Sequence, residues 1–372
     1  MSSAGRVVVI GGGIVGAACA LECARGGLEV TLLERDVVCG SGATAAGMGQ
    51  IVVMDDTAAE LALTSYAAQL WDAMAPHLPA DCEYERCGTI WVAADDEGRA
   101  AVERKAHLYR ANGVESQVLD AAALYACEPN LRAGLAGGLR VPGDAILYAP
   151  RAAAALLAQA QALGTRVRYG SGVQALADKG VRLDDGTSLE SAAVVVASGV
   201  HAVELLPELP VRPRKGHLVI TERYPTVVHH QVVELGYLKS AHGTERDSVA
   251  FNVQPRPTGQ LLIGSSRQLD AADTRVDRAI VRRMLERALA YLPALAALEA
   301  VRIWAGHRAA TPDGLPYIGP LLGREHVLLA TGHEGLGITT SLATGRLIAD
   351  HLLARRPEID PTPYLPARMH RE

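Results

Sequence analysis

The sequence predicts an α/β protein in which a Rossmann-like domain is interleaved with an α+β domain built on a large antiparallel sheet. Its first 34 residues contain an apolar strand, a glycine-rich turn, an apolar helix and a second strand. Residues 211–267 instead alternate between apolar and polar side chains, as the strands of an antiparallel sheet do. The 372 residues also exceed the size of about 250–300 residues at which a single core stops growing. We therefore expect two closely connected domains.

The N-terminal strand and helix are the clearest elements. A strand is expected over residues 6–10, where four apolar residues follow Arg6, and the apolar helix expected over residues 14–25 is stopped by Gly26 and Gly27. The segment LEVTLLER predicts a second buried strand that ends at Glu34. Because a crossover helix joins the two strands, the sheet should be parallel where it begins.

Further along the chain, elements of the two domains alternate. Helices are predicted over residues 58–75, 96–112, 120–126, 150–163 and 275–292, and Asp185 and Gly186 mark the turn of a hairpin. The clearest further strands are CGTIWVA, AAVVVASG, LVITE, SVAFNVQP and GQLLIGSS, and the C-terminal region contains a strand, a glycine loop and a helix. This order assigns residues 1–80, 145–205 and 300–372 to the Rossmann-like domain, and residues 81–144 and 206–299 to the second, cap domain.

Composition argues against several classes of protein. The formal net charge of −5, the pI near 6.2 and the lack of a Lys/Arg block make nucleic acid an unexpected partner. The apolar runs are strand-length or interrupted by charges, and the N-terminus enters a strand directly, so no transmembrane segment or secretory signal is predicted. We expect a cytoplasmic protein that reaches the inner membrane only through partners. The six cysteines lack the spacing of a metal site, so no metal is expected.

A G-x-G-x-x-G motif between the first strand and helix indicates a dinucleotide site. Gly11 permits the tight turn, Gly13 lets the backbone approach a pyrophosphate, and Gly16 lets helix and strand pack closely. Glu34 ends the second strand, where a carboxylate accepts hydrogen bonds from both ribose hydroxyls and repels a 2′-phosphate. The cofactor should therefore contain ADP-ribose without the extra phosphate, as NAD and FAD both do. Neighbouring residues expected to contact it are Ile14, Val15 and Arg35.

Two further glycine-rich loops favour FAD over NAD. The stretch CGSGATAAGMGQI is rich in small residues, whose backbone could lie against a pyrophosphate and a flat ring. The stretch ATGHEGLGI follows an apolar strand and opens a helix, so its amides would face the N1/O2 edge of a flavin. Taken alone, the first could be an ordinary flexible loop and the second a plain helix N-terminus. Expected cofactor-binding residues in the two loops are Ser41, Thr44, Ala45, Gly47, Met48, Gly332, Gly335, Leu336, Gly337 and Ile338.

These segments together resemble a known family. The glycine turn, Glu34, SGATAAGMG, AGHRAATPDGLPYIGP and ATGHEGLGITTSLATGRLIADHL resemble the FAD-dependent amine and amino-acid oxidoreductases of the D-amino-acid oxidase, glycine oxidase and sarcosine oxidase group. The resemblance spans nearly the whole chain. Within that group, the second and third glycine-rich loops look most like the β subunit of bacterial D-hydroxyproline dehydrogenase and the related hydrogen cyanide synthase flavoprotein.

The resemblance implies FAD held in extended form between the two domains, with Val173 and Gly306 added to its binding residues. It also implies a heteromeric dehydrogenase whose partner subunits pass the electrons on. The sarcosine oxidase type attaches FAD through a cysteine after the C-terminal strand, and this chain has no cysteine beyond Cys127. No covalent attachment of the flavin is therefore expected.

The resemblance also places a substrate handle. Arg308 corresponds to the arginine that holds the substrate carboxylate in glycine oxidase-like sequences, although Ala309 replaces the proline that follows it there. A guanidinium clamps a carboxylate with two parallel hydrogen bonds. His333 borders the expected flavin site, where it is either a ligand or a satisfied structural histidine. Further candidate substrate-site residues are Met48 and Gln50, and weaker ones from the cap are Tyr148, Tyr237 and Arg256.

The predicted reaction is oxidation of a small amino acid at its Cα–N bond, by hydride transfer to flavin N5, to give an imine. The most favoured substrate is a cyclic secondary D-amino acid such as cis-4-hydroxy-D-proline. Leu262 lies near the point where monomeric sarcosine oxidases place a lysine that helps oxygen react, which favours a dehydrogenase. The alternatives are a glycine or sarcosine oxidase, a hydrogen cyanide synthase-like flavoprotein, a non-catalytic FAD electron-transfer subunit and an NAD-dependent dehydrogenase.

Overall fold

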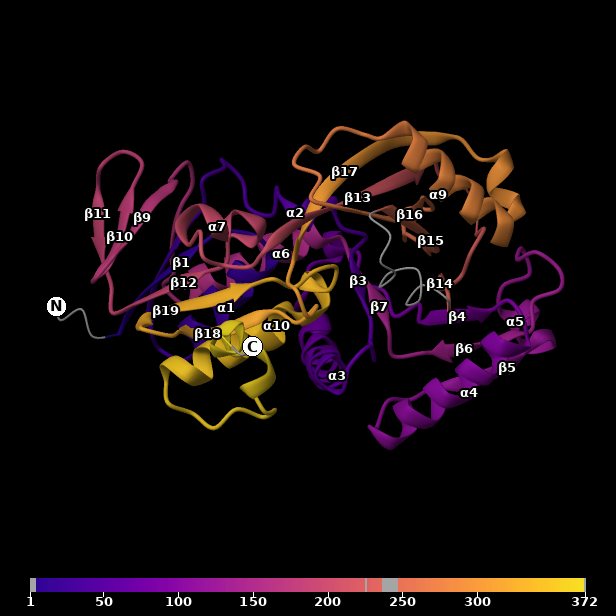
Figure 1. The fold of residues 1–372 in the computed structure, drawn as a ribbon, viewed down its shortest axis with the longest axis horizontal. Coiled ribbons are helices and arrows are strands. Elements are labelled where there is room, and N and C mark those ends of the chain that lie inside the picture. Colours follow the sequence, from indigo (N-terminus) through magenta and orange to yellow (C-terminus); the bar gives the residue numbers. More distant parts are fainter. Residues whose placement is uncertain (1–4, 225, 236–246, 371–372) are drawn as a thin grey trace.

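A computed structural model describes residues 5–224, 226–235 and 247–370. Two large sheets organise the chain, one of six strands and one of eight (Figure 1). In Figure 1 the six-stranded sheet lies on the side that carries both chain termini, and the eight-stranded sheet lies on the opposite side. The predicted fold class, a Rossmann-like α/β sheet interleaved with a second large sheet, is confirmed.

The six-stranded sheet is parallel except at one edge. Its order is β18-β19-β12-β1-β2-β8, and only β18 runs antiparallel to its neighbour. Residues 7–10 of β1 and all of β12 are apolar and buried, as expected for central strands of a covered parallel sheet. The bounds are β1 (Arg6–Ile10), β2 (Glu29–Leu33), β8 (Arg166–Arg168), β12 (Ala193–Val196), β18 (Tyr317–Leu321) and β19 (Arg324–Thr331).

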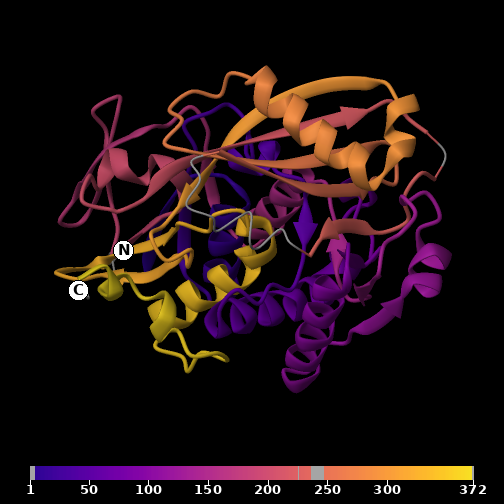
Figure 2. The same cartoon turned by 45° about the vertical axis from the view of Figure 1, so that its right-hand side comes forward.

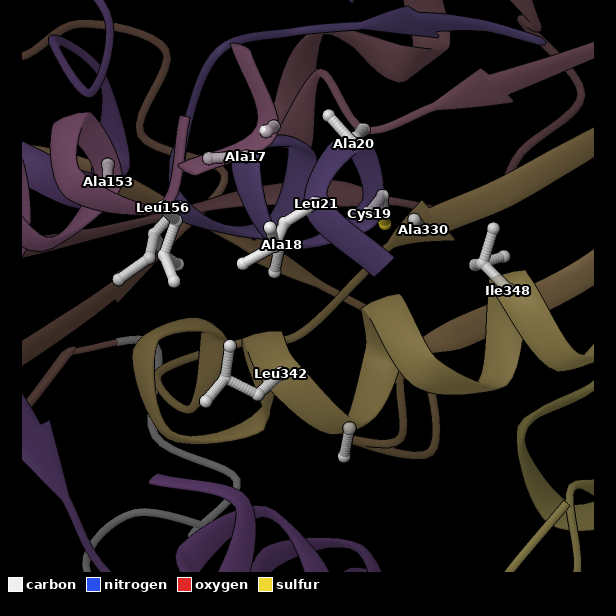
Figure 3. Close-up of a cluster of buried hydrophobic side chains, with 14 of the residues drawn as sticks. Ala17, Ala18, Cys19, Ala20, Leu21, Ala153, Leu156, Ala330, Leu342 and Ile348 are labelled. Carbon is white, nitrogen blue, oxygen red and sulfur yellow. The ribbon is translucent and has the colours of Figure 1, made fainter. Parts of the chain in front are cut away.

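Helices with small residues pack closely on this sheet. Helix α1 contacts both α6 and α10, and α10 in turn contacts α3. Figure 3 shows the small side chains of α1 in one buried cluster with Leu156 of α6 and Leu342 of α10. A Cβ on Gly345 would lie 2.6 Å from the carbonyl oxygen of Ala18, so the backbones of α10 and α1 nearly touch there. The bounds are α1 (Ile14–Arg25), α3 (Ala58–Met74), α6 (Ala149–Ala162) and α10 (Gly337–Leu352).

The eight-stranded sheet follows the order β17-β13-β16-β15-β14-β4-β6-β5. It is antiparallel as predicted, except that β14 pairs in parallel with β4. These two strands are not joined by a hairpin, because the chain passes through the other sheet between them, and so they are free to run in the same direction. The bounds are β4 (Thr89–Ala93), β5 (Gln117–Asp120), β6 (Gly137–Val141), β13 (Arg212–Thr221), β14 (Gln231–Glu234), β15 (Asp247–Pro255), β16 (Leu261–Leu269) and β17 (Ala300–Ala310).

Helices α4 (Asp96–Ala111), α5 (Ala121–Cys127) and α9 (Arg278–Tyr291) pack on the eight-stranded sheet. Figure 2 shows α9 lying across β15 and β16 on the face turned away from the first sheet. Edge strand β17 pairs with β13 along its whole length, although its residues fall in the range assigned above to the Rossmann-like domain. No helix among residues 5–224, 226–235 and 247–370 is long and apolar enough to cross a membrane.

Short elements complete the fold. The predicted hairpin at Asp185 and Gly186 joins β10 (Gly180–Leu183) to β11 (Ser188–Glu190), and β9 (Val173–Ala177) completes this small sheet. Strand β3 (Gln50–Ile51) pairs with β7 (Ala145–Ile146), and α2 (Ala43–Ala46) precedes β3. Helix α7 (Ala202–Leu205) follows β12.

Candidate functional site

The glycine turn between β1 and α1 packs tightly against the neighbouring strand. Gly11 has a φ of +105°, and a Cβ at this position would lie 2.7 Å from the carbonyl oxygen of Ala197. A Cβ on Gly16 would lie 1.9 Å from the carbonyl oxygen of Gly11. A side chain at either position would displace backbone, so the turn needs glycine at both.

Glu34 lies beside this turn at the end of β2. Its Oε2 accepts a hydrogen bond of 2.6 Å from the Gly12 N–H, and its Oε1 accepts one of 2.9 Å from the Asp36 N–H. The residue is only 8% exposed. The carboxylate is thereby fixed where a dinucleotide fold holds the adenosine ribose.

The second glycine-rich segment is anchored on the first. Thr44 Oγ1 accepts a hydrogen bond of 3.0 Å from the Ile14 N–H, at the start of α1. Gly13 is the N-cap of that helix, and a Cβ on it would lie 3.3 Å from the same threonine oxygen. Ala45 belongs to the short helix α2, whose C-cap is Gly47.

The third glycine-rich segment closes on the other two. A Cβ on Gly337 would lie 3.9 Å from Val15 Cγ2, and a Cβ on Gly47 would lie 3.0 Å from Ile338 Cδ1. Gly332 has a φ of +81°, and Leu336 is the N-cap of α10. The three segments, although far apart in the sequence, therefore meet in one place.

One face of β17 borders the second and third segments. Trp304 Nε1 donates a hydrogen bond of 3.3 Å to the Ala46 carbonyl, and a Cβ on Gly306 would lie 2.3 Å from Ala46 Cβ. Residues 304, 306 and 308 lie on the same face because side chains alternate along a strand. The Glu334 N–H donates a hydrogen bond of 3.0 Å to the Ala309 carbonyl and so holds the third segment against β17.

Arg308 occupies the space that neighbouring glycines leave open. A Cβ on Gly216 would lie 2.4 Å from Arg308 Nη1, and one on Gly335 would lie 3.5 Å from Arg308 Nε. Arg308 Nη1 donates a hydrogen bond of 2.9 Å to the Ser266 carbonyl. The guanidinium is therefore held between β13, β16 and the third glycine-rich segment.

Met48 and Gln50 lie on the sheet side of the second segment. The Met48 carbonyl accepts a hydrogen bond of 2.7 Å from Gln254 Nε2, and Met48 Sδ would be 3.1 Å from a Cβ on Gly264. The amides of Gln50 and Asn252 exchange two hydrogen bonds of 3.0 and 3.3 Å. The segment is therefore fixed to the eight-stranded sheet through β15 and β16.

His333 is buried, and its ring contacts α10. Its Nε2 lies 2.9 Å from Thr344 Oγ1, and burial lowers the pKa of the imidazole to about 3. A neutral imidazole therefore links the third segment to the helix that follows it. Of the two roles predicted from the sequence, these contacts favour the structural one.

The remaining candidates lie farther from this meeting point. Arg35 Nη2 is 2.8 Å from His201 Nε2 at the surface, and the Ser41 hydroxyl donates to Asp36. Val173 is the first residue of β9. Two residues before it, the Ser171 N–H donates a hydrogen bond to the Glu34 carbonyl.

Two of the weaker cap candidates contact each other. The guanidinium of Arg256 forms hydrogen bonds of 3.0 and 2.5 Å with Glu83 Oε2 and stacks over the ring of Tyr148 at 5.0 Å. Tyr237 lies outside the described residues.

Several residues of this region were missed from the sequence. Trp304, Asn252 and Gln254 could have been found from strand alternation, since each shares a face with Arg308 or with its neighbours across the sheet. Ser266 and His217 could not, because the pairing of β16 with both neighbours shifts in register near Ser266. A register shift changes which groups face the site.

These residues fit FAD. The close approaches at Gly11 and Gly16 and the glycine cap of α1 form a turn whose backbone a pyrophosphate can approach, and no acidic residue lies in the first turn of the helix to repel it. Glu34 would hold the ribose, and residues 44–48 and 332–338 would border the flavin ring.

Comparisons with known proteins identify the family of the chain. The family described as FAD dependent oxidoreductase (DAO) matches residues 6–351. Glycine oxidase of Pseudomonas aeruginosa is 31% identical over 97% of this chain and 98% of that protein. D-amino acid dehydrogenase of Methylobacterium nodulans is 29% identical over 95% of this chain and 96% of that protein. The crystal structure of glycine oxidase from Geobacillus kaustophilus superimposes with a TM-score of 0.87 at 29% identity and covers 99% of both chains.

The fold and the glycine-rich segments therefore define an FAD-dependent oxidoreductase. The chain belongs to the DAO family of FAD-dependent oxidoreductases. The predictions of FAD as cofactor and of an enzyme of this family are confirmed.

Proposed function

We propose that the protein oxidises the Cα–N bond of a small amino acid to an imine, with Arg308 holding the substrate carboxylate. The observation that supports this most is the position of Arg308, whose Nε would be 3.5 Å from a Cβ on Gly335 in the third glycine-rich segment. Bound FAD would accept the hydride, which carries both electrons of the oxidation. The related glycine oxidase and D-amino acid dehydrogenase act, by their names, on amino acids.

Arg308 would orient the substrate by binding both oxygens of its carboxylate. A planar guanidinium that binds both oxygens of a carboxylate fixes the plane of that group and so the direction of the Cα–H bond. The amine, once deprotonated, contributes its lone pair to the new C=N bond as the hydride leaves. No proton-accepting side chain is needed on the protein for this step.

Within this class we propose a cyclic secondary D-amino acid such as cis-4-hydroxy-D-proline as the substrate. Leu218 Cδ2 and Met48 Sδ flank Gly264, and a Cβ there would lie 2.9 and 3.1 Å from them. This apolar wall suits the methylene groups of a saturated ring. The paired amides of Gln50 and Asn252 lie beside it and could accept or donate a hydrogen bond at a ring hydroxyl.

The proposal includes a role as the catalytic β subunit of a dehydrogenase whose partner subunits take the electrons. We also propose that the FAD-binding domain comprises residues 1–80, 145–205 and 311–372. The boundary at 311 takes account of β17, which pairs along its length with a strand of the substrate domain.

A second candidate is glycine oxidation with oxygen as the electron acceptor. Its support is the 31% identity with glycine oxidase over nearly the whole chain. Glycine needs the same carboxylate clamp but no room for a ring. The two candidates therefore differ in substrate size and in the fate of the electrons.

One experiment separates them. The purified flavoprotein is mixed without oxygen with a panel containing cis-4-hydroxy-D-proline, D-proline, L-proline, sarcosine and glycine, while the visible flavin absorbance is followed. We expect the cyclic D-amino acids to bleach the flavin fastest and oxygen to reoxidise it slowly. Bleaching by glycine with rapid peroxide release would favour the second candidate. A spectrum that no amino acid changes would contradict amino-acid oxidation altogether and favour an electron-transfer subunit.

A further inference from the structure

A buried serine, Ser266, connects Arg308 to the face of the eight-stranded sheet on which α9 packs. Its Nη1 donates to the Ser266 carbonyl at 2.9 Å, on the face where the glycine-rich segments lie. Ser266 Oγ accepts a hydrogen bond of 2.9 Å from the His217 N–H and lies 3.0 Å from His217 Nδ1. Ser266 is 1% exposed and His217 is fully buried. A single residue thus contacts Arg308 with its backbone and His217 with its side chain.

The surroundings of His217 determine which ring nitrogen carries the proton. The Asp277 N–H, just before α9, donates a hydrogen bond of 3.0 Å to His217 Nε2. Because Nε2 accepts, a neutral ring carries its proton on Nδ1 and donates it to Ser266 Oγ. The hydrogen bonds therefore run in one direction, from the start of α9 through His217 to Ser266.

Strand pairing explains why the Ser266 carbonyl is available to Arg308. The register between β13 and β16 shifts between the pairs Lys215–Gln268 and Val219–Ile263, which leaves one extra residue on β16. Such a bulge interrupts the ladder and turns backbone groups out of it. The Ser266 carbonyl lies in this interrupted stretch and accepts a hydrogen bond from Arg308.

We propose that Ser266 and His217 are positioning residues that hold the guanidinium of Arg308 in the orientation a substrate carboxylate requires. This inference rests on the proposed function, in which Arg308 binds that carboxylate. It adds two residues that touch neither substrate nor flavin and act only through Arg308.

The charged groups around His217 support a neutral ring. Burial lowers the pKa of His217, and the cations of Lys215 on β13 and Arg308 on β17 lower it further. The carboxylate of Asp277 and a hydrogen bond with the Arg275 backbone, both before α9, oppose this by raising the pKa. Protonation would give Nε2 a hydrogen that faces the Asp277 N–H and would add a third positive charge beside Lys215 and Arg308. A pH below the ordinary pKa range of histidine should therefore protonate His217 and disturb the orientation of the Arg308 guanidinium.

The test measures binding and chemistry separately in the FAD-loaded protein. Ser266→Ala and His217→Phe are mixed anaerobically with cis-4-hydroxy-D-proline, and acetate serves as a carboxylate probe through its effect on the flavin spectrum. We expect the Kd of both probes to rise about tenfold, which corresponds to about 1.4 kcal/mol, with a smaller change in the limiting rate of flavin reduction. Unchanged Kd values in both variants would overturn the inference.

Two controls separate positioning from loss of stability. Asp95→Ala removes the N-cap hydrogen bond of α4, elsewhere on the same sheet, and should lower the unfolding midpoint without changing either Kd. In an Arg308→Ala background, Ser266→Ala should cause no further loss of affinity, since the group it positions is gone. A full additional loss in that background would show that Ser266 acts by another route and would overturn the inference.

The pH profile provides a readout that a purely structural serine would not change. In the wild type, the affinity for the acetate anion, corrected for the acetic acid that forms at low pH, should fall on the acid side as His217 gains a proton, and His217→Phe should lack that additional fall. If the wild type binds neither probe, or Arg308→Ala binds both as tightly as the wild type, the proposed function fails and this inference with it. If Arg308→Ala loses affinity but the profile of His217→Phe matches the wild type, only the inference fails.

Discussion

Arg308 reaches the glycine-rich segments because its neighbours have no side chains. Gly216 stands beside it on β13 and Gly335 faces it from the third segment, and a Cβ on Gly216 would overlap the guanidinium. The arginine is thus accommodated by glycines on two elements far apart in the sequence. A longer residue at Gly216 would push the guanidinium away from the Ser266 carbonyl, to which it donates.

Replacing Arg308 tests its role directly. Arg308→Ala should weaken transition-state binding in flavin reduction by about 2–5 kcal/mol, as for loss of a buried charge-pair partner. Arg308→Lys should recover part of this, because it keeps the charge but loses the bidentate geometry. The measurement is kcat/KM for flavin reduction by stopped flow. The control is Arg282→Ala, which changes an exposed helix residue. Kinetics of Arg308→Ala within about twofold of the wild type would assign the carboxylate to another residue.

Glu34 provides a test of the cofactor rather than the substrate. The Glu34 carboxylate accepts hydrogen bonds from the Gly12 and Asp36 N–H groups and would accept them from the ribose hydroxyls. Glu34→Gln removes its negative charge. Hydrogen bonds to charged groups are worth about 1.5–3 kcal/mol, so the Kd of FAD should rise about 10- to 100-fold. Fluorescence titration of apoprotein with FAD measures it. Glu29→Gln, at the start of the same strand, should leave the affinity unchanged, and equal affinities for all three proteins would argue against a ribose contact.

A buried carboxyl should give the stability a distinct pH dependence. Burial raises the pKa of Asp144 to about 7, and its Oδ1 accepts the Val53 N–H at 3.1 Å. The unfolded chain releases this proton near pH 3.9, so the stability linked to the protonated form is complete below about pH 4 and is lost as the pH rises through about 7.

Asp144→Asn stays neutral and should therefore gain stability relative to the wild type across that window, by up to about 1.4 kcal/mol per pH unit. Urea unfolding at pH 5 and pH 8 measures the difference. The exposed Asp178→Asn is the control. A difference between Asp144→Asn and the wild type that does not change with pH would contradict a raised pKa in the folded protein.

At the scale of elements, the contact between α1 and α10 fixes two of the three glycine-rich segments relative to each other. Both helices begin at such a segment, and they approach closely at Gly345 and Ala18. Small residues along α1 allow this approach, as Figure 3 shows. The distance between the glycine turn and the third glycine-rich segment therefore depends on helix packing.

Gly345→Ala should separate these helices. The added Cβ would lie 2.6 Å from the Ala18 carbonyl oxygen, and overpacking of this kind costs about 1–3 kcal/mol. We expect a lower urea midpoint and weaker FAD retention. Gly143→Ala is the matched control, because the nearest atom to its Cβ would be the end of the Arg86 side chain at 3.8 Å. Equal midpoints for the two variants would mean that the helices adjust without cost.

At the scale of the whole molecule, the sequence predicts what local periodicity determines. The βαβ unit, the hairpin at Asp185 and Gly186, and the helix predicted over 58–75 and observed at Ala58–Met74 each depend on neighbouring residues. The parallel pairing of β14 with β4 could not be predicted, because the two strands come from separate passes of the chain. No pattern in the sequence of either strand indicates this long-range pairing.

The candidate site divides in the same way. Gly11, Gly16 and Glu34 have a spacing that follows from one supersecondary unit, so their proximity could be predicted. The contact of Arg308 with Ser266 could not, since it depends on a register shift in β16. The resemblance to a family identified Arg308 where spacing alone would not have done so.

The most direct test of the account is a crystal structure of the protein with FAD and acetate bound. We predict that the flavin ring lies between residues 44–48 and 332–338, and that both acetate oxygens lie within hydrogen-bonding distance of the Arg308 guanidinium. Acetate bound elsewhere while Arg308 contacts only protein atoms, or a flavin ring outside these segments, would contradict it.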